Sequence, residues 1–344
     1  MVSSKDVAKK AKVSQATVSR VLNSPHLVKA ETRQKILQAI EELNYIPNEN
    51  ARNLVSKKSN TISLISGPLE NSFYVDTTSN IVKYATSKGY KVNVHFSLTE
   101  DIQATYDIAL SHKIDGLIVS SILLQDPLVE RVEKLNIPLV SFNRRHESLG
   151  NFVEIDNFQA GYDALCHLVE YGHRNILWIG ASEVVSTFKH RFLGFKQAVN
   201  DLKPDPRYSD MMIRSINYKH IDRPDLQKLL SRLYRAKQLP SAICAATDAI
   251  AMEAMDILIS LGMCIPQDIS IIGIDNVKIS RNQLIQLTTI GSIDEQCLGL
   301  IAIKKLIELI ENPQEEKINI TLPVSLYLRN STKNTDSILQ KSIL

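Results

Sequence analysis

Apolar residues recur three or four positions apart near the start of the chain, and this spacing predicts three short helices. Ser3 and Asp6 approximate a capping box for the first helix, and Ser14 is placed to cap the second, QATVSRVLN. The third runs through TRQKILQAIEELNYIP and stops before Pro47. The predicted buried positions are Val7, Ala8, Ala11, Val18, Val21, Leu22, Ile36, Leu37, Ile40 and Leu43. Two short helices joined by a tight turn and braced by a third form a helix-turn-helix unit.

From residue 61 the pattern changes to short apolar runs that alternate with amphipathic stretches. The predicted strands are TISLIS, YKVNVHF, DGLIVS, IPLVSF, VEID, NILWIG, SAICAA and ISIIGI. Helices are predicted at 73–88, 158–171, 190–202, 222–236 and 248–261, with Gly89 and Gly172 as C-caps. Continuous apolar strands between helices are typical of parallel sheets covered on both faces. Because roughly ten such units exceed one compact sheet, the sequence predicts an α/β body of two doubly wound lobes.

The stretch ENARNLVSKKSN, residues 49–60, lies between these two parts. Its composition is compatible with about two turns of helix, but Leu54 and Val55 are its only sizeable apolar residues. A helix shorter than ~12 residues is marginal in water without tertiary packing. We therefore expect this segment to become ordered only when it is bound to a partner.

The net charge of +3 is distributed unevenly. Residues 1–60 contain 11 lysines and arginines against 5 acidic residues, so they carry +6 and the remaining chain carries −3. A basic head on a mildly acidic body indicates contact with a polyanion. No apolar run reaches the ~18 residues that span a bilayer, and the N-terminus has no signal-peptide pattern. We expect a cytoplasmic protein without membrane contact.

The four cysteines carry no sign of a metal or redox site. Cys166, Cys244, Cys264 and Cys297 stand singly in apolar segments, without a CxxC or a metal-ligand spacing. The sequence predicts buried, reduced thiols and no cofactor or metal.

The second predicted helix begins with small and polar residues, which suits insertion into the major groove of DNA. Gln15 has the chemistry to pair with adenine, Arg20 to pair with guanine, and Thr17 to reach a phosphate or a thymine methyl. Taken singly, each is more often a plain surface residue. Together, in a basic segment, they favour DNA contact. The candidates on this helix are Ser14, Gln15, Ala16, Thr17, Ser19, Arg20 and Asn23.

Several motifs closely resemble the lactose/galactose repressor family of bacterial transcription factors. In the head they are DVAKKAKVSQATVSRVLN, TRQKILQAIEELNYIPN and ARNL. In the body they are DGLIVSS, IPLVSFNRR, VEIDNFQAG, YGHRNILWIG, HRFLGFKQA, AATDAIAMEAM and IPQDISIIGIDN, which are also similar, more distantly, to periplasmic sugar-binding proteins. One departure is Lys12, where the family often has glycine; a non-glycine residue at positive φ costs roughly 1 kcal/mol.

The resemblance covers residues 3–330 and implies a domain organisation. It implies a helix-turn-helix domain at 1–47, a hinge helix at 48–59, a core at 60–330 and a tail at 331–344. One lobe would comprise 60–157 with about 291–321, and the other 158–290 with about 322–330, so that the chain crosses three times, near 157–161, 288–292 and 320–324.

The resemblance also implies a homodimer on a near-palindromic operator, with two hinge helices packed over its centre. Leu54 would then wedge into the minor groove and kink the duplex, and Arg52 would lie near phosphates. The tail STKNTDSILQKSIL is too short for the several heptads of a coiled-coil tetramer.

Candidate ligand residues lie just past predicted strand ends, where ligands bind to doubly wound sheets. Position and family likeness together give an effector-binding set of Pro68, Phe73, Tyr74, Ser121, Asn143, Arg191, Thr247 and Asp275. An arginine and an aspartate opposed across a cleft can hold vicinal hydroxyls, which is the arrangement expected of Arg191 and Asp275. Phe73 or Tyr74 can cover the flat face of a sugar or a base.

Simpler interpretations apply to several of these residues. Phe73 is as easily a core residue as a ligand contact. Asp248 is interpreted as the N-cap of the helix that follows it, and His173 as a structural loop residue. Ser72 stands where the family commonly has a proline, Asn143 where it has an acid, and Thr247 where it has an asparagine, so the family likeness does not identify the effector.

The sequence predicts a ligand-responsive, sequence-specific DNA-binding transcriptional regulator, a repressor of carbohydrate or related catabolic genes. Its small-molecule effector, a sugar or a sugar-like metabolite, would shift the hinge geometry and the operator affinity. A purine or nucleoside effector is the alternative for such a regulator. The body alone would also suit a solute-binding transport protein, but the basic head does not. The motifs GxxxxGK[ST], HExxH and GxGxxG are missing, which argues against an enzyme.

Overall fold

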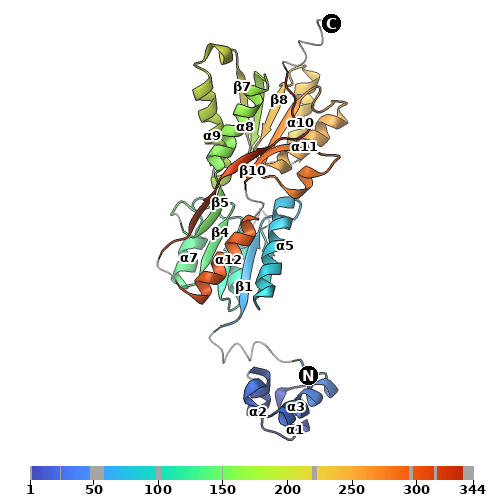
Figure 1. Cartoon of the computed structure of the whole chain (residues 1–344), viewed down its shortest axis with the longest axis vertical. Coiled ribbons are helices and arrows are strands. Elements are labelled where there is room, and N and C mark those ends of the chain that lie inside the picture. The colour runs from blue at the N-terminus through green and yellow to red at the C-terminus, as the bar shows by residue number, and fades with distance from the viewer. Residues whose placement is uncertain are drawn as a thin grey trace. The chain divides into compact units, whose positions relative to one another are not determined.

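The computed structural model describes residues 2–23, 25–46, 58–97, 102–148, 150–218, 223–293, 297–313 and 316–335. The chain divides into two compact units, Met1–Ser59 and Asn60–Leu344 (Figure 1). Residues 47–57, which hold most of the predicted hinge helix together with Arg52 and Leu54, lie outside the described residues. The two units are therefore described one at a time.

The head consists of α1 (Ser4–Lys10), α2 (Gln15–Asn23), the short 3-10 helix η1 (Pro25–Leu27) and α3 (Ala30–Glu42). The predicted caps are present. The Asp6 carboxylate accepts hydrogen bonds from the Ser3 backbone at 2.9 Å and the Ser3 hydroxyl at 2.7 Å, and Ser14 Oγ accepts from the Thr17 amide at 3.1 Å. Lys12 occupies the turn with φ 54°, in the left-handed region of backbone conformation that favours glycine.

The helices of the head pack on a small apolar core, whose fully buried members are Val7, Ala8, Val18, Val21, Ile36 and Ala39. The prediction for Leu37 was wrong: this side chain is 51% exposed, and Ala39 on the neighbouring turn is buried instead. The third helix also ends earlier than predicted. Asn44 adopts φ 44°, and the Tyr45 amide donates to the Ile40 carbonyl at 2.9 Å, a Schellman motif that ends the helix before Pro47.

The first lobe of the body contains a six-stranded parallel sheet in the order β11-β5-β4-β3-β1-β2. Its strands are β1 (Thr61–Ser66), β2 (Lys91–Phe96), β3 (Gly116–Val119), β4 (Leu139–Phe142), β5 (Phe152–Ile155) and β11 (Asn319–Leu322). Its helices are α5 (Ser72–Ser87), α6 (Ile102–Leu110), α7 (Leu128–Lys134) and α12 (Leu298–Glu311). Gly89 ends α5 with φ 81°, as the sequence predicted.

The second lobe contains a six-stranded sheet in the order β12-β10-β9-β8-β6-β7. Its strands are β6 (Asn175–Gly180), β7 (Met212–Asn217), β8 (Ala242–Ala245), β9 (Ser270–Ile274), β10 (Thr288–Ser292) and β12 (Val324–Tyr327). Its helices are α8 (Asn157–Glu170), α9 (Ser186–Leu202), α10 (Arg223–Arg235) and α11 (Asp248–Ser260), with 3-10 turns η2 (Pro206–Tyr208) and η3 (Lys278–Arg281). The predicted fold class, a helical head with two doubly wound lobes, is confirmed.

One strand departs from the expected parallel arrangement, because β12 runs antiparallel to β10. Strand β11 belongs to the first sheet, β12 belongs to the second, and Pro323 alone separates them. The chain therefore leaves the first sheet at its carboxyl edge and enters the second sheet at the corresponding edge. The carboxyl ends of the two sheets thus face each other, which brings the predicted ligand residues of both lobes to one region.

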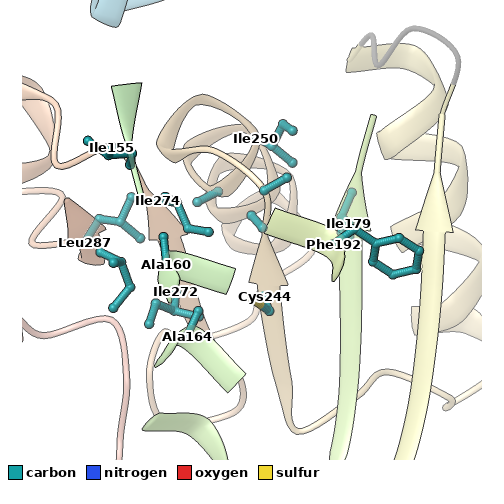
Figure 2. Close-up of a cluster of buried hydrophobic side chains, with 14 of the residues drawn as sticks. Ile155, Ala160, Ala164, Ile179, Phe192, Cys244, Ile250, Ile272, Ile274 and Leu287 are labelled. Carbon is teal, nitrogen blue, oxygen red and sulfur yellow. The ribbon is translucent and has the colours of Figure 1, made fainter. Parts of the chain in front are cut away.

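One cluster of buried apolar side chains contains residues of both lobes, and Figure 2 shows a part of it that belongs mainly to the second lobe. Trp178 on β6 is fully buried, stacks on Phe192 with ring centroids 5.6 Å apart, and donates its indole N–H to Asn217 at 2.9 Å. Gly161 and Gly194 let α8 and α9 cross in backbone contact: a Cβ at Gly161 would lie 1.9 Å from the Arg191 carbonyl oxygen. This close crossing fixes the depth of Arg191 in the lobe.

The first residues of the predicted tail are part of the second lobe. Ser331 is 1% exposed and donates its hydroxyl to the Ile271 carbonyl at 2.6 Å, and the Thr332 hydroxyl lies 3.0 Å from His167 Nε2. His173, interpreted as structural, is buried and contacts Ser241 Oγ and the Lys333 carbonyl, each at 3.1 Å. These contacts fasten the end of the described chain to α8 and to the second sheet.

The four cysteines are all free thiols. Cys244 is buried, and burial raises the pKa of its thiol. Cys166 and Cys297 are half-buried, and burial raises the pKa of Cys166 to about 11. The prediction of a buried thiol was wrong for Cys264, which is exposed because it follows the end of α11 rather than lying within the core.

Candidate functional site

The exposed face of α2 carries most of the predicted DNA contacts. Thr17 is half-buried, and the exposed members are Ser14, Gln15, Ala16, Ser19 and Arg20. The opposite face of the helix is buried through Val18 and Val21. Asn23 is the last residue of α2. The helix therefore turns an apolar face to the core of the head and a polar face, with one arginine, to solvent.

The start of α2 is held by side-chain hydrogen bonds. Gln15 Nε2 donates to Ser4 Oγ at 2.9 Å, which connects α2 to the first turn of α1. Ser14 Oγ lies 2.8 Å from the Thr17 hydroxyl, and Lys10 pairs with Glu42 at 2.8 Å, which connects α1 to α3. A surface that reads DNA needs such a fixed frame, because base contacts require defined side-chain positions.

Arg191 on α9 is the centre of a buried polar cluster in the second lobe. Its side chain is 1% exposed, and each of its three nitrogens donates a hydrogen bond. Nε donates to Asn157 Oδ1 at 2.9 Å, Nη1 to the Ala246 carbonyl at 2.6 Å, and Nη2 to Asp275 Oδ1 at 2.6 Å. The expectation that Arg191 and Asp275 oppose each other across a cleft was wrong, because both belong to the second lobe and form an ion pair.

The residues before α11 have different roles from those predicted. Thr247, not Asp248, is the N-cap, because Thr247 Oγ1 accepts the Ile250 amide at 3.2 Å. Asp248 is fully buried in the first turn, where its carboxylate accepts from the Thr289 hydroxyl at 2.5 Å and the Val277 amide at 2.9 Å. Burial and the nearby Asp275 carboxylate raise the pKa of Asp248. Burial also raises the pKa of Asp275, and the Arg191 guanidinium opposes that effect.

The backbone after β9 is held in an uncommon conformation. Asp275 has φ 135° and Asn276 has φ 51°. Arg329 donates to Asn276 Oδ1 at 2.5 Å, and Gly291 leaves the room that Asn276 occupies, since a Cβ there would lie 2.4 Å from Asn276 Cβ. Such strain persists only where the surroundings fix it, so the orientation of Asp275 is imposed by the lobe.

The predicted ligand residues of the first lobe gather after β1, β3 and β4. Pro68 is exposed, and Phe73 is half-buried against Tyr74, with ring centroids 5.4 Å apart in an edge-on arrangement. Tyr74 is buried and its ring lies against Gly67, where a Cβ would be 2.3 Å from the ring. Ser121 and Asn143 are also buried. Phe73 thus contacts the core and also lies beside the candidate site.

Hydrogen bonds join the two lobes beside these residues. The Asn143 carbonyl accepts from Thr187 Oγ1 at 2.8 Å, and the Arg145 amide donates to Ser186 Oγ at 2.9 Å. The Arg145 guanidinium also lies 3.3 Å from His190 Nε2. Sequence reasoning missed this seam: Ser186 and Thr187 lie outside the motifs that it used, and His190, the first residue of HRFLGFKQA, was given no role.

A chain of polar contacts connects the seam to Arg191. Arg145 pairs with Glu154 at 2.9 Å, Asn157 Nδ2 donates to Glu154 at 3.1 Å, and Asn157 Oδ1 accepts from Arg191. Burial raises the pKa of Glu154, and the Arg145 guanidinium opposes this. Burial and the Arg145 charge lower the pKa of His190. The motif VEIDN contains two of these residues, and this was the signal in the sequence that could have found them.

The described residues hold no cluster of three or more histidine, cysteine or acidic side chains arranged to bind a metal ion. No helix in the described ranges is long and apolar enough to cross a membrane. The chemistry available near the facing strand ends is hydrogen bonding and ion pairing.

Comparison with known proteins gives two matching families. "Bacterial regulatory proteins, lacI family" matches residues 4–48, and "Periplasmic binding protein-like domain" matches residues 165–332. The chain is 30% identical to the HTH-type transcriptional repressor PurR of Pasteurella multocida, an alignment covering 97% of this chain and 99% of that protein. It is 32% identical to the ribose operon repressor of Halalkalibacterium halodurans, with 98% and 99% covered. A solved lac repressor dimer bound to operator and the anti-inducer ONPF has a TM-score of 0.80 at 27% identity, with 96% and 99% covered.

Proposed function

Since the chain belongs to the lacI family of bacterial regulatory proteins, we propose that the exposed face of α2 reads operator DNA and that an effector held at the facing strand ends of the body controls this binding. Family membership confirms the resemblance seen in the sequence. It also confirms a DNA-binding transcriptional repressor rather than an enzyme, since the relatives are repressors.

The DNA-binding proposal rests on one observation: α2 is amphipathic, with a buried apolar face and an exposed polar face. Its buried face fixes the helix in the head, and its exposed face presents Gln15, Ser19 and Arg20. The head has a net positive charge, which supports salt-dependent attraction to phosphates. The solved lac repressor binds operator as a dimer, and this chain acts as a dimer on operator DNA in the same way.

The effector proposal is supported by the polar groups at the facing strand ends. Arg191 and Asp275 supply donors and acceptors from the second lobe, and Tyr74, Ser121 and Asn143 supply them from the first. The relatives include a ribose operon repressor, which supports a carbohydrate or a similar metabolite. A purine or nucleoside effector is less well supported, and a transport role does not account for the head.

The hinge remains part of the proposal on sequence grounds. Leu54 would enter the minor groove and Arg52 would lie near phosphates, in a segment at 48–59 that orders on DNA. Leu54→Ala is then expected to weaken specific operator binding while the affinity of the body for its effector is unchanged. Operator affinity equal to that of the parent protein would contradict this role. Because a repressor must reach the DNA inside the bacterial cell, we also propose that the protein works in the cytoplasm.

The DNA-binding proposal is tested by fluorescence anisotropy on an operator selected from genomic fragments. Arg20→Ala is expected to lower the preference for operator over random DNA by about 1–3 kcal/mol, since a bidentate arginine contact discriminates bases by that amount. Lys35→Ala is the matched control: Lys35 is a head cation that already pairs with Glu31 at 2.8 Å. Equal losses on operator and random DNA in Arg20→Ala would show that Arg20 contacts only phosphate.

A further inference from the structure

Arg144 follows β4 in the first lobe and has no acidic partner among the residues that the structure describes. Its guanidinium donates from Nη2 to the Tyr74 hydroxyl at 3.1 Å and from Nη1 to the Ser121 carbonyl at 3.4 Å, and both acceptors are neutral. No carboxylate in the described ranges of the chain lies within ion-pair distance of it. A guanidinium has five N–H donors, so three remain available.

The neighbouring charged groups are already satisfied by other partners. Arg145 pairs with Glu154, and Arg191 pairs with Asp275. Asp126, a buried acid between β3 and α7, accepts from the Tyr106 hydroxyl at 2.7 Å and from the Leu123 and Leu128 amides at 3.1 and 3.0 Å. Arg144 therefore makes no ion pair with these carboxylates, whose oxygens are held by other donors.

Two buried hydroxyls belong to the segments that Arg144 contacts, one on Ser121 and one on Ser72, two residues before Tyr74. Ser121, whose carbonyl accepts from Arg144, is 4% exposed, and its Oγ has no hydrogen-bond partner among the described residues. Ser72 Oγ, at the start of α5, is also buried and unpartnered within the part of the chain that is described. An unsatisfied buried hydroxyl costs free energy, so a ligand that accepts a hydrogen bond from each would fit. The N-terminus of the 16-residue helix α5 adds a partial positive charge.

The residue before Arg144 adds no negative charge. Asn143 is a neutral amide, so it places no carboxylate next to the arginine. Asn143 is buried, with φ 65°, which fixes the start of the segment that carries Arg144. The first lobe thus combines, after β3 and β4 and at the start of α5, one cation without an ion-pair partner among the described residues, two unpartnered hydroxyls and the Tyr74 hydroxyl.

We propose that the effector carries an anionic group, a carboxylate or a phosphate, and that Arg144 binds this group together with the hydroxyls of Ser121 and Ser72. The inference rests on the proposed function, because it assumes that the effector binds at these strand ends. Arg144 is thereby a specificity-determining residue: it selects a charged metabolite over the neutral sugar of the same skeleton. A guanidinium matches both carboxylate and phosphate oxygens, so either group satisfies the site.

The test is calorimetric titration of the full chain with matched sets of ligands. Each set holds a neutral sugar, its uronic or aldonic acid and its phosphate ester, built on glucose, galactose and ribose. We expect one anionic compound to bind at least about 10-fold more tightly than its neutral parent, the gain expected of one charge-assisted contact. The acid and ester arms distinguish carboxylate from phosphate. A panel in which no anion shows this preference overturns the proposal.

Variants test whether the preference for an anionic ligand depends on Arg144. Arg144→Gln is expected to lower the affinity for the preferred anion about 10-fold to 100-fold, with Arg144→Lys intermediate because it keeps charge but loses the planar fork. Arg131→Gln, which removes an exposed cation of α7 from the same lobe, is the control and leaves that affinity unchanged. Unchanged anion affinity in Arg144→Gln would refute the assignment. Operator binding, measured with and without each compound of the panel, separates the two proposals: its absence under every condition in the parent protein contradicts the proposed function, whereas anion preference is read directly from the titrations.

Discussion

Two arginines lie at the carboxyl ends of the two sheets, in opposite electrostatic situations. Arg191 in the second lobe is fully buried, and all three of its nitrogens are hydrogen-bonded, one of them to Asp275. Arg144 in the first lobe is half-buried and contacts two neutral oxygens. An arginine neutralised within a rigid cluster holds its lobe together and offers a ligand only its remaining N–H groups, whereas an arginine without an ion-pair partner can also pair with an anion. The same residue type thus serves two purposes in lobes of related topology.

The largest effect is expected from removing the buried arginine. Arg191→Gln deprives Asp275 of its ion-pair partner inside the lobe, and breaking a buried pair on one side costs about 3–5 kcal/mol. Trp178, the single tryptophan of the chain, lies in the core of the same lobe and reports its unfolding by fluorescence. Urea titration of the full chain followed at this residue measures the loss. A change below about 1 kcal/mol would mean that Arg191 is not a structural element of the lobe.

Sequence reasoning found the regions of the site better than its partnerships. Strand ends follow from apolar runs bounded by polar residues, and this rule placed Ser121, Asn143 and Asp275 at the facing edges of the sheets, whereas Tyr74 came from the family likeness. Ion pairs depend on the depth and direction of side chains, which periodicity does not specify. Arg191 meets Asp275 within one lobe because α9 crosses α8 in backbone contact at Gly161 and Gly194, and two isolated glycines give no such signal in a sequence.

Errors of a single residue had similar causes. Thr247 and Asp248 are both good N-caps, and the backbone decided for Thr247 because Asp248 is needed by Thr289 and Val277 from another part of the lobe. In the head, the buried face of α3 runs through Ile36 and Ala39, which lie three residues apart, while Leu37 is turned about 100° around the helix from Ile36 and faces solvent. In both cases the local sequence was compatible with more than one residue in the role, and tertiary packing determined which residue takes it.

A second prediction concerns the pH dependence of stability, which we expect from His167 in the second lobe. Burial and the neighbouring His173 lower the pKa of His167 to about 4, below the ~6.5 of an unfolded histidine. The unfolded chain therefore binds more protons between these values, so this histidine's contribution to stability is complete above pH ~6.5 and is lost as the pH falls toward 4. The loss is on the order of 3 kcal/mol.

The measurement compares the Trp178 unfolding midpoint of the parent chain and of His167→Gln between pH 7 and pH 4.5. The difference between the two proteins is the observable, because buried acids such as Glu154, whose pKa is raised, act in the opposite direction. The parent is expected to lose stability relative to the variant on acidification. Parallel pH profiles would show that His167 titrates normally.

A third prediction tests the helix crossing that positions Arg191. Gly161→Ala places a Cβ 1.9 Å from the Arg191 carbonyl oxygen, so α8 and α9 must separate, at about 1–3 kcal/mol for such overpacking. Effector affinity should fall with stability, since Arg191 moves with α9. Gly150→Ala is the control, because a Cβ there meets no atom within 4 Å. Equal stability of the two variants would show that the close crossing of α8 and α9 does not position Arg191.

The smallest effect on stability is expected from Arg144→Gln, and this variant tests the comparison of the two arginines most directly. Arg144→Gln makes the same change of residue as Arg191→Gln, but it removes a charge that has no acidic partner in the described part of the chain, so no carboxylate is left unpaired. Substitutions of this kind usually change stability by no more than about 0.5 kcal/mol. The Trp178 midpoint in urea should therefore match that of the parent, while anion binding is lost. A stability loss comparable with that of Arg191→Gln would mean that Arg144 holds its lobe together as Arg191 does, and the distinction between a structural arginine and a ligand-binding one would have to be abandoned.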